Sequence, residues 1–248
     1  FSAAAEEAMK AKIRAFLLRQ SFFPDWLGIF VNPFYFARSG LASGIRKYSN
    51  SLNGVLLDVG CGTKPYQELF SVENYIGLDI DSDSSRMRAI ADYFYDGTTF
   101  PFSDEIFDSI LCNQVLEHVF NPDCFLTEIY RVMKPGAKML LTVPFVWDEH
   151  EQPYDYARYS SFGLKSLLER NGFKILRHKK LGADSSVLFQ LANAYLYKIT
   201  LSSNKYVQYF LMIFIMGFVN LLGLLARGIL PSNPDLFLDH IILVEKSL

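Results

Sequence analysis

Cysteine and net charge are both scarce in this sequence, and each scarcity excludes a class of protein. The 248 residues include three cysteines, none of them in a C-x-x-C pair, and this odd count fits a reducing compartment better than a disulfide framework. The formal net charge is −2 with acidic and basic residues intermixed, which indicates no surface for nucleic acid. The chain opens at Phe1 without the basic, apolar and small-residue series of a signal peptide, so we expect none.

The most informative glycines lie in one turn. An apolar segment, Val55–Val59, runs into Gly60-Cys61-Gly62, and a second apolar segment, Tyr75–Leu78, ends at Asp79. That acid lies 21 positions after Asp58. A strand, a Gly-x-Gly turn and an acid about 20 residues further on are typical of a nucleotide site, in which the acid binds the ribose hydroxyls.

The residues after this turn exclude two phosphate-binding motifs. Residues 63–66, Thr-Lys-Pro-Tyr, follow Gly62, so the third glycine of a dinucleotide fingerprint is missing. The Gly-Lys-Ser/Thr of a P-loop is missing as well. The stretch from Leu57 to Thr63 instead resembles motif I of class I methyltransferases that depend on S-adenosylmethionine (SAM).

Four further segments extend the resemblance in the same order and spacing, over residues 54–144. The whole pattern is similar to the type 11-like methyltransferase domain family. The resemblance implies a Rossmann-like fold, SAM as the cofactor and methyl transfer as the reaction. The four segments are Phe100–Asp104, Phe107–Ile110, Asn113–His118 and Glu128–Ala137.

Alternating strand and helix patterns predict an α/β fold with a doubly wound, Rossmann-like sheet. At 248 residues the chain fits one such domain with an appendage. We expect a mostly parallel sheet with an antiparallel last strand, and only a turn between the second and third strands because Ile80–Arg88 is short. The expected strands are Val55–Val59, Tyr75–Leu78, Ala89–Phe94, Ile106–Cys112, Met139–Val143, Phe173–Arg177 and His240–Val244.

The sequence predicts four regions. Residues 1–53 are expected to form an N-terminal helical cap, with an amphipathic helix at Ala3–Gln20 and a second helix at Leu41–Ser49. The SAM-binding core is expected over 54–182. An apolar helical insertion follows at 183–237, and residues 238–248 supply the last strand of the core.

The resemblance assigns the methionine and ribose ends of SAM. It places Asp58 and the backbone of Gly60, Cys61 and Gly62 around the methionine group. Asp79 is the ribose acid.

The resemblance also assigns the adenine and methyl ends. Ile80 is expected to pack on the adenine, and Asp96, beside Gly97, to accept from its amino group; Asp92 competes for that role. Asn113 is expected to line the methyl-donor pocket.

Two nearby residues have less defined roles. Lys64 stands where the family usually has glycine, and it is expected either to pair with the cofactor carboxylate or to point to water. His118 is expected to pack and to cap a helix rather than to act as a base.

A loop rich in acids and aromatics, Pro144–Tyr159, leaves the last parallel strand, at the edge where open α/β sheets bind ligands. A hydroxyl acceptor needs a base, and His150 is our candidate because the ordinary pKa of histidine is near neutral. Asp155 or Glu149 is expected to orient this imidazole or to act in its place.

The same loop is expected to bind the acceptor through Tyr154, Tyr156 and Arg158. The alternative interpretation is a polar surface loop held by Arg–Asp pairing. Residues 153–159 resemble a stretch in methyltransferases of bacterial surface-glycan assembly. We expect no metal at residues 148–150, because consecutive side chains of an extended segment cannot all point inward.

The longest stretch without a charged residue is Tyr206–Ala226, which is long enough to cross a bilayer. A single crossing would separate the last two strands, which belong to one sheet, so we expect the insertion to return to the same side. Ser185–Leu201 is the expected partner helix. The pair has three possible roles: a lid over the acceptor, a homodimer interface within 185–230, or a helix at a membrane surface.

These patterns predict a SAM-dependent methyltransferase for a small or lipid-linked acceptor, such as a hydroxyl of a surface glycan or its precursor. One alternative is a C-methyltransferase of a quinone-like membrane lipid. Another is a non-catalytic SAM-fold module that docks to a membrane assembly. The expected location is the cytoplasm, with the inner face of the membrane as the site of any peripheral contact.

Overall fold

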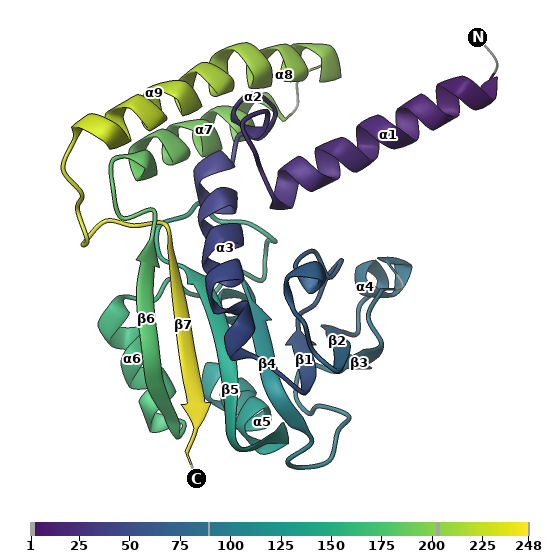
Figure 1. The fold of residues 1–248 in the computed structure, drawn as a ribbon, viewed down its shortest axis with the longest axis vertical. Helices are drawn as coiled ribbons and strands as arrows, with labels where there is room; N and C mark the ends of the chain where they lie inside the picture. The colour runs from purple at the N-terminus through teal and green to yellow at the C-terminus, as the bar shows by residue number, and fades with distance from the viewer. Residues whose placement is uncertain (1–2, 89, 202–203, 248) are drawn as a thin grey trace. The chain divides into compact units, whose positions relative to one another are not determined.

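The computed structural model describes residues 3–88, 90–201 and 204–247. The chain forms two compact units (Figure 1). The helical unit consists of the residues up to Ala42 together with Gly182–Phe237, and the sheet unit consists of Ser43–Leu181 together with the residues from Leu238 onward. Each unit is therefore built from two segments that are far apart in the sequence.

The sheet unit is built on a seven-stranded sheet with the strand order β3-β2-β1-β4-β5-β7-β6. The first five strands run parallel, and β7 is antiparallel to its neighbours β5 and β6. This confirms the expected mostly parallel, doubly wound sheet with an antiparallel last strand. The strands are β1 (Val55–Val59), β2 (Asn74–Ile80), β3 (Tyr93–Tyr95), β4 (Phe107–Asn113), β5 (Met133–Pro144), β6 (Phe173–Leu181) and β7 (Asp239–Lys246).

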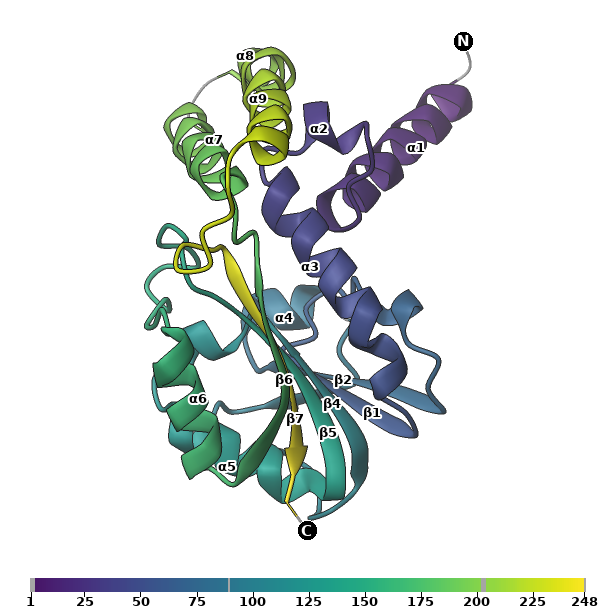
Figure 2. The same cartoon turned by 60° about the vertical axis from the view of Figure 1, so that its left-hand side comes forward.

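Two helices of this unit, α5 (Pro122–Val132) and α6 (Ser161–Arg170), lie on the same face of the sheet (Figure 2). Each begins at a side chain that accepts a hydrogen bond from a backbone N–H of the first turn, Asn121 for α5 and Ser160 for α6. Their buried leucines and isoleucines join the central strands in one apolar core, which holds the sheet edge in place. The core includes Leu126, Ile129, Leu164, Leu168, Ile110 and Met139.

Short helical elements precede β1 and connect some of the following strands. Helix α4 (Asp83–Arg88) has six residues, in keeping with the short connection expected there. The 3₁₀ turns are η1 (Ser49–Ser51), η2 (Gln67–Leu69) and η3 (Leu116–His118).

Several strand limits differ from the expected ones: β6 ends at Leu181 rather than Arg177, and the starts of β3 and β5 differ most among the strand starts. β3 begins at Tyr93 rather than at Ala89, a position outside the described residues. β5 begins at Met133 rather than Met139, because Met133 pairs with Phe107 before the register of β4 and β5 shifts. Local sequence does not fix such a limit, since the pairing depends on a strand that is distant in the chain.

Among its described residues, the helical unit contains five complete α-helices, the first part of a sixth and a π-helical turn. α1 (Ala3–Phe22) is the helix expected at Ala3–Gln20, but Met9, Ile13 and Leu18 on it are exposed. The other elements are α2 (Gly28–Val31), the first half of α3 (Tyr35–Tyr48), α7 (Ser186–Thr200), α8 (Lys205–Leu211), η4 (Met212–Met216) and α9 (Gly217–Ile229).

The interior of the helical unit contains hydrogen-bonded amide side chains beside apolar ones such as Phe36, Val187 and Met216. Asn193 on α7 donates to the side-chain oxygen of Asn220 on α9 at 2.9 Å, and Asn220 donates to the backbone oxygen of Ile29 at 2.8 Å. Gln190 accepts from the backbone N–H groups of Phe36 and Ala37. All three amide side chains are fully buried.

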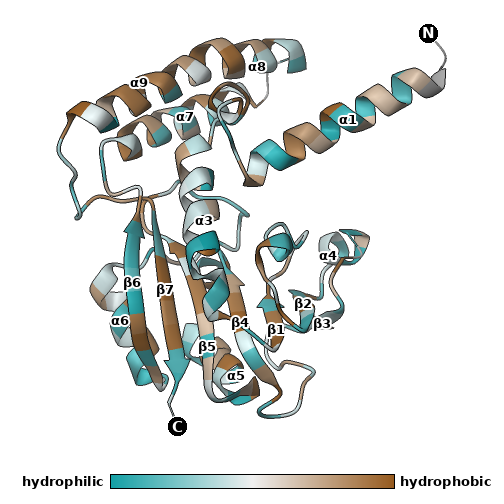
Figure 3. Cartoon of the chain, viewed as in Figure 1, coloured by the Kyte–Doolittle hydropathy of each residue, from teal (hydrophilic) through white to brown (hydrophobic). Residues whose placement is uncertain are grey.

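The exterior of the same unit is apolar, and α7 and α9 appear as largely hydrophobic ribbons in Figure 3. The apolar residues of α7 at helical spacing are Leu188, Leu191, Tyr195 and Ile199, of which Leu188, Tyr195 and Ile199 are exposed. On the other helix the exposed set is Tyr206, Val207, Tyr209, Phe210, Ile213, Phe214, Ile215, Phe218, Leu221, Leu222, Leu225 and Ile229. The sequence pattern identified this face of α7 correctly but did not show that it points outward.

Candidate active site

The glycine turn after β1 has the geometry that the motif requires. Gly60 and Gly62 have positive φ angles of 70° and 52°. The N–H groups of Gly60 and Cys61 donate to the backbone oxygen of Leu78 at 2.8 and 3.1 Å, which fastens the turn to β2. A Cβ at Gly60 would lie 2.4 Å from Val115 Cγ2, so only glycine fits there.

Asp58 lies in β1 just before this turn, and its side chain is buried. Its Oδ2 accepts a hydrogen bond of 2.6 Å from the hydroxyl of Tyr75. Burial raises the pKa of Asp58 to about 7, in spite of that hydrogen bond and the charge of Lys64. A buried carboxylate of this kind fits a cationic ligand group such as the ammonium of SAM, because a nearby positive charge favours its ionised form.

Lys64 takes neither of its expected roles. Its Nζ lies 2.5 Å from Oδ2 of Asp92, which also accepts a 2.7 Å hydrogen bond from the N–H of Gly77. The backbone of Lys64 keeps the positive φ, 51°, that suits the glycine usual in the family. Asp92 thus holds the turn and β2 together, which makes it a weaker candidate for the adenine than Asp96.

The acid expected at the ribose stands at the end of β2. Asp79 is 7% exposed, and its Oδ1 accepts from the N–H of Ile80 at 2.9 Å. Its Oδ2 lies 3.3 Å from Nη2 of the half-exposed Arg88, a pair that ribose hydroxyls could displace at little cost because surface ion pairs are weak.

The residues expected at the adenine lie close together beyond Asp79. A Cβ built on Gly97 would lie 3.6 Å from Cδ1 of Ile80, so this side chain passes directly over Gly97. Asp96 is exposed, and its Oδ1 accepts from Thr98 and Thr99, which lowers its pKa to about 2. The carboxylate is therefore ionised and able to accept a further hydrogen bond.

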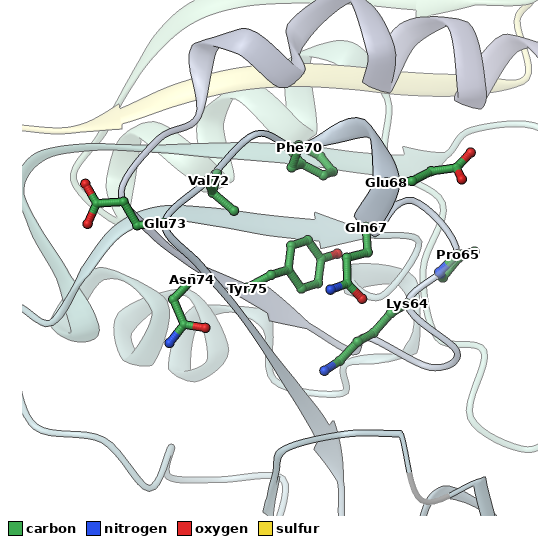
Figure 4. Close-up of a pocket in the computed structure, with 9 residues that line it drawn as sticks. All are labelled: Lys64, Pro65, Gln67, Glu68, Phe70, Val72, Glu73, Asn74 and Tyr75. Carbon is green, nitrogen blue, oxygen red and sulfur yellow. The ribbon is translucent and has the colours of Figure 1, made fainter.

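An open hollow lies on the other side of the glycine turn (Figure 4). Tyr75 lines it and donates from there to Asp58, and Lys64 lies at its rim. Neither Asp79 nor Asp58 lines the hollow, so it borders the methionine end of the expected cofactor site without containing the ribose end. Its remaining lining residues are Pro65, Gln67, Glu68, Phe70, Val72, Glu73 and Asn74.

Asn113 ends β4 beside β1, with Cys112 in register with Val59. The Oδ1 atom of Asn113 accepts from the hydroxyl of Thr142 on β5 at 2.8 Å. The residue is thus held at the same edge of the sheet as the glycine turn, where the methyl-donor pocket is expected.

The loop after β5 folds back over η3. The backbone N–H groups of Tyr156 and Ala157 donate to the backbone oxygen of Glu117 at 2.8 and 3.2 Å. Nδ1 of His118 lies 2.8 Å from the backbone oxygen of Tyr154. These contacts bring His150 against His118, with ring centroids 4.8 Å apart.

Asp155 organises this loop. Its Oδ2 accepts from the backbone N–H of His150 at 3.0 Å and lies 3.3 Å from Nδ1 of the same residue. Arg158 donates to both carboxylate oxygens at 2.6 Å. The pKa of Asp155 is lowered to about 2 by these hydrogen bonds, against the opposing effect of its burial. Asp155 is therefore placed to orient His150, as expected, while Arg158 holds Asp155.

The other residues expected in the acceptor pocket are more exposed. Glu149 is exposed and accepts a long hydrogen bond, 3.4 Å, from Gln152. Tyr154 and Tyr156 are both exposed, and the ring of Tyr156 packs against Phe120 at 5.3 Å.

One residue of this cluster was missed by the sequence interpretation. Glu117 is fully buried, and burial raises its pKa to about 8. Neither of its carboxylate oxygens has a hydrogen-bond partner among the described residues. One ligand atom from each of Glu117, His118 and His150 lies within 4.8 Å of the others, so these three could hold a metal ion. The signal was the Leu-Glu-His motif itself, in which a glutamate precedes a histidine in an apolar stretch.

Comparisons with known proteins place the sheet unit in a family. Residues 57–141 match the family model described as a methyltransferase domain. A fatty-acid O-methyltransferase from Mycolicibacterium smegmatis is 31% identical over 160 residues, 57% of this chain and 56% of that protein. The uncharacterized protein MJ1123 from Methanocaldococcus jannaschii is 34% identical over 90 residues, 35% of this chain and 43% of that protein. The chain thus spans about half the length of these relatives.

Solved structures agree on the fold. Phosphoethanolamine N-methyltransferase 2 from Haemonchus contortus, in complex with SAM, has a TM-score of 0.54 at 17% identity and covers 94% of this chain and 56% of that one. The cyclase SpnF has a TM-score of 0.55 at 20% identity, over 86% and 82% of the two chains. Residues 57–141 are therefore a class I methyltransferase domain of the type 11 family, whose cofactor is SAM.

Proposed function

We propose that this chain is a SAM-dependent methyltransferase that methylates a hydroxyl group of a lipid or lipid-linked acceptor at a membrane surface. The observation that carries the proposal is the common sheet edge. At this edge, the glycine turn and the buried acids Asp58 and Asp79 lie at the ends of the neighbouring strands β1 and β2. An imidazole–carboxylate cluster lies in the segments that follow β4 and β5.

SAM, when bound, supplies a methyl group made electrophilic by its positively charged sulfur. This chain's residues have to hold it and exclude water, which is a matter of positioning. Asp79 would accept from the ribose hydroxyls, and Asp58 would balance the ammonium of the methionine group. Ile80 and Asp96 would hold the adenine by packing and by hydrogen bonding.

The cluster beside this site supports an acceptor that must lose a proton. His150, oriented by Asp155, lies in the loop that follows β5, and an imidazole with an orienting carboxylate is a common general base. The name of the Mycolicibacterium smegmatis relative also specifies an oxygen acceptor on a fatty acid. A hydroxyl acceptor fits these groups, because the proton that its oxygen loses could pass to the imidazole.

The helical unit supports a lipid environment for that acceptor. In water, apolar side chains gather inside and polar ones outside. This unit departs from that pattern: hydrogen-bonded amides lie inside beside buried apolar side chains, and many leucine, isoleucine and phenylalanine side chains lie outside. That distribution suits helices in contact with lipid, where interior polar groups satisfy each other. The helix Lys205–Ile229, 25 residues long, is also apolar enough to enter a bilayer.

Charge distribution gives the same indication. The helical unit has eight basic and five acidic residues, a net charge of +3, whereas the sheet unit has 16 basic and 21 acidic residues, a net charge of −5. A positive, apolar unit would be attracted to the anionic inner face of a cell membrane. We therefore place the enzyme in the cytoplasm with its helical unit at that face.

The test is transfer of a labelled methyl group from SAM into extract of the source cells, followed by partition between organic and aqueous phases. Label in the organic phase, bound as an acid-stable methyl ether, is the expected result. Label on a ring carbon would replace this proposal with C-methylation of a quinone-like lipid. Label in the aqueous phase alone would refute the lipid acceptor. A chain that binds no SAM would instead be the non-catalytic module given above as an alternative.

One substitution separates the cluster from the cofactor site. His150→Ala should lower turnover by about 10²- to 10⁴-fold, the usual contribution of a general base, and leave the affinity for SAM unchanged. His178→Ala removes an imidazole from β6 and should leave turnover unchanged. Full activity in His150→Ala would show that this imidazole takes no part in the reaction.

A further inference from the structure

We propose that Glu117, His118 and His150 form a binding site for a divalent transition-metal ion. The three residues come from two segments, η3 and the loop after β5, that the hydrogen bonds of Tyr156 and Ala157 to the backbone of Glu117 hold together. The sequence alone gave no reason to expect a metal here, because its acidic candidates, residues 148–150, are consecutive.

The first reason to propose a metal ion is that Glu117 is buried without hydrogen-bond donors in the described part of the chain. Its side chain is fully buried, and neither oxygen has a hydrogen-bond donor among the described residues. A buried carboxylate without partners costs several kcal/mol, so proteins rarely retain one unless an ion or water satisfies it. Its Oε1 lies 3.8 Å from Nε2 of His118, too far for a hydrogen bond.

The orientation of the two imidazoles is the second reason. Nδ1 of His118 lies 2.8 Å from the backbone oxygen of Tyr154, which can only accept, so Nδ1 carries the proton and Nε2 has a free electron pair. Nδ1 of His150 lies 3.3 Å from the backbone oxygen of Asp148 and 3.3 Å from Oδ2 of Asp155, which both accept, and 3.4 Å from Nη2 of Arg158, which can only donate. Histidines that bind metals are usually fixed in this way through their other nitrogen.

One positive charge lies close to the proposed site. Nη2 of Arg158 is 3.4 Å from Nδ1 of His150, on the side of the ring away from Nε2. Arg158 is paired with both oxygens of Asp155 at 2.6 Å, so the two charges offset each other. Asp155 and Arg158 are thus positioning residues for the His150 ligand.

The donor set indicates the kind of ion. Two imidazole nitrogens with one carboxylate oxygen are the ligands of catalytic zinc sites and of the facial triads that hold iron(II), and imidazole is a poor ligand for Mg²⁺ or Ca²⁺. Ligand bonds of about 2.0 to 2.2 Å at tetrahedral angles place two ligand atoms roughly 3.4 Å apart, so binding draws the three ligand atoms closer together than in this structure. The observed spread of 4.8 Å closes by rotations of the imidazoles.

Three protein ligands leave coordination positions open. This part of the inference rests on the proposed function: the acceptor hydroxyl would bind at an open position, where the cation lowers the pKa of the O–H group. The O–H bond then breaks, its proton passes to water, and the oxygen keeps the electron pair. In this arrangement His150 is a ligand of the cation rather than a base that takes up the proton.

The test is titration of the chelator-treated chain with Co²⁺, without SAM, followed by visible absorption. The expected result is one ion bound per chain, with intensified ligand-field bands and no thiolate charge-transfer band. Glu117→Gln and His118→Ala should each weaken binding by about tenfold or more, while His178→Gln should bind like the wild type. Glu117→Gln keeps the shape of a buried side chain, so this variant should remain folded.

Each other result overturns the inference. Absence of Co²⁺ binding would do so, as would unchanged binding in either cluster variant or equal loss in His178→Gln. Activity tests the proposed function separately. A chelator-treated chain that binds no ion and still methylates a hydroxyl at full rate would refute the metal site and leave the proposed function intact. A chain that binds the ion but methylates no hydroxyl would refute the proposed function and leave the metal site intact.

Discussion

Replacing Asp58 by asparagine should stabilise the chain without SAM, and more so near pH 8 than near pH 5. The pKa of this carboxyl rises from 3.8 to about 7 on folding, mainly because it is buried. A folded-state pKa above the unfolded value means that the native state binds more protons, so stability falls as the pH rises from about 4 to about 7. Asparagine carries no such penalty and can still accept from Tyr75.

The size of the effect follows from that shift. A rise of about three pKa units corresponds to about 4 kcal/mol once the pH exceeds the folded-state pKa, and this is an upper bound because a buried site can relax. Near pH 5 only about 1.6 kcal/mol of the penalty is present. We therefore expect the stability gain of Asp58→Asn to grow by about 2 to 3 kcal/mol between these two pH values.

Urea unfolding of the wild type and the variant, followed at both pH values with a probe in the sheet unit, measures the difference. Glu68→Gln is the control, since it removes an exposed acid of the same unit. A variant that is less stable than the wild type near pH 8, or a gain that does not depend on pH, would refute the argument from burial. SAM should narrow the gap, because its ammonium favours the ionised Asp58.

Three further substitutions test the cofactor site and the helical unit. Asp79→Ala should lower SAM affinity by about tenfold to a hundredfold in calorimetry, because it removes a charged hydrogen-bond acceptor, and unchanged affinity would reject the ribose assignment. Gly60→Ala should destabilise the fold by about 1 to 3 kcal/mol in urea, since φ is positive and Val115 leaves no room, and an unaffected midpoint would contradict this geometry. Phe214→Lys changes a side chain that is 60% exposed and should reduce flotation with phosphatidylglycerol-containing vesicles about tenfold. The control, Phe162→Lys, changes a phenylalanine on α6 that is 86% exposed and should leave flotation unchanged. Equal flotation of the two variants would reject the membrane face.

The sequence predicted the sheet well because its signals are local. Buried strands such as Val55–Val59 are short apolar runs, and the Gly60 turn has a positive φ angle that few other residues adopt. The strand starts that differed most, at β3 and β5, depend on pairing between distant segments. A local pattern cannot show where such pairing starts.

The candidate site was predictable only in part, for a similar reason. Asp79 and Asp155 stand where the motifs suggested, because each follows a strand end at the carboxyl edge. The proximity of Glu117 to His150 depends on how the loop after β5 folds back, through backbone hydrogen bonds that no residue type encodes. Lys64 shows the same limit, since its partner, Asp92, comes from the next connection along the sheet.

The attachment of the helical unit links its apolar surface to the proposed chemistry. Residues 182–237 leave the sheet unit after Leu181 and return at Leu238, whose N–H donates to the backbone oxygen of Leu181 at 2.9 Å. Asp239, the next residue, is in register with both Leu181 and Pro144, so the two connections lie at the edge where β5 ends. That is the edge from which the loop carrying His150 departs. In the proposed function, a lipid contact of the helical segment would therefore tether the sheet unit through the strand edge from which the loop with His150 departs.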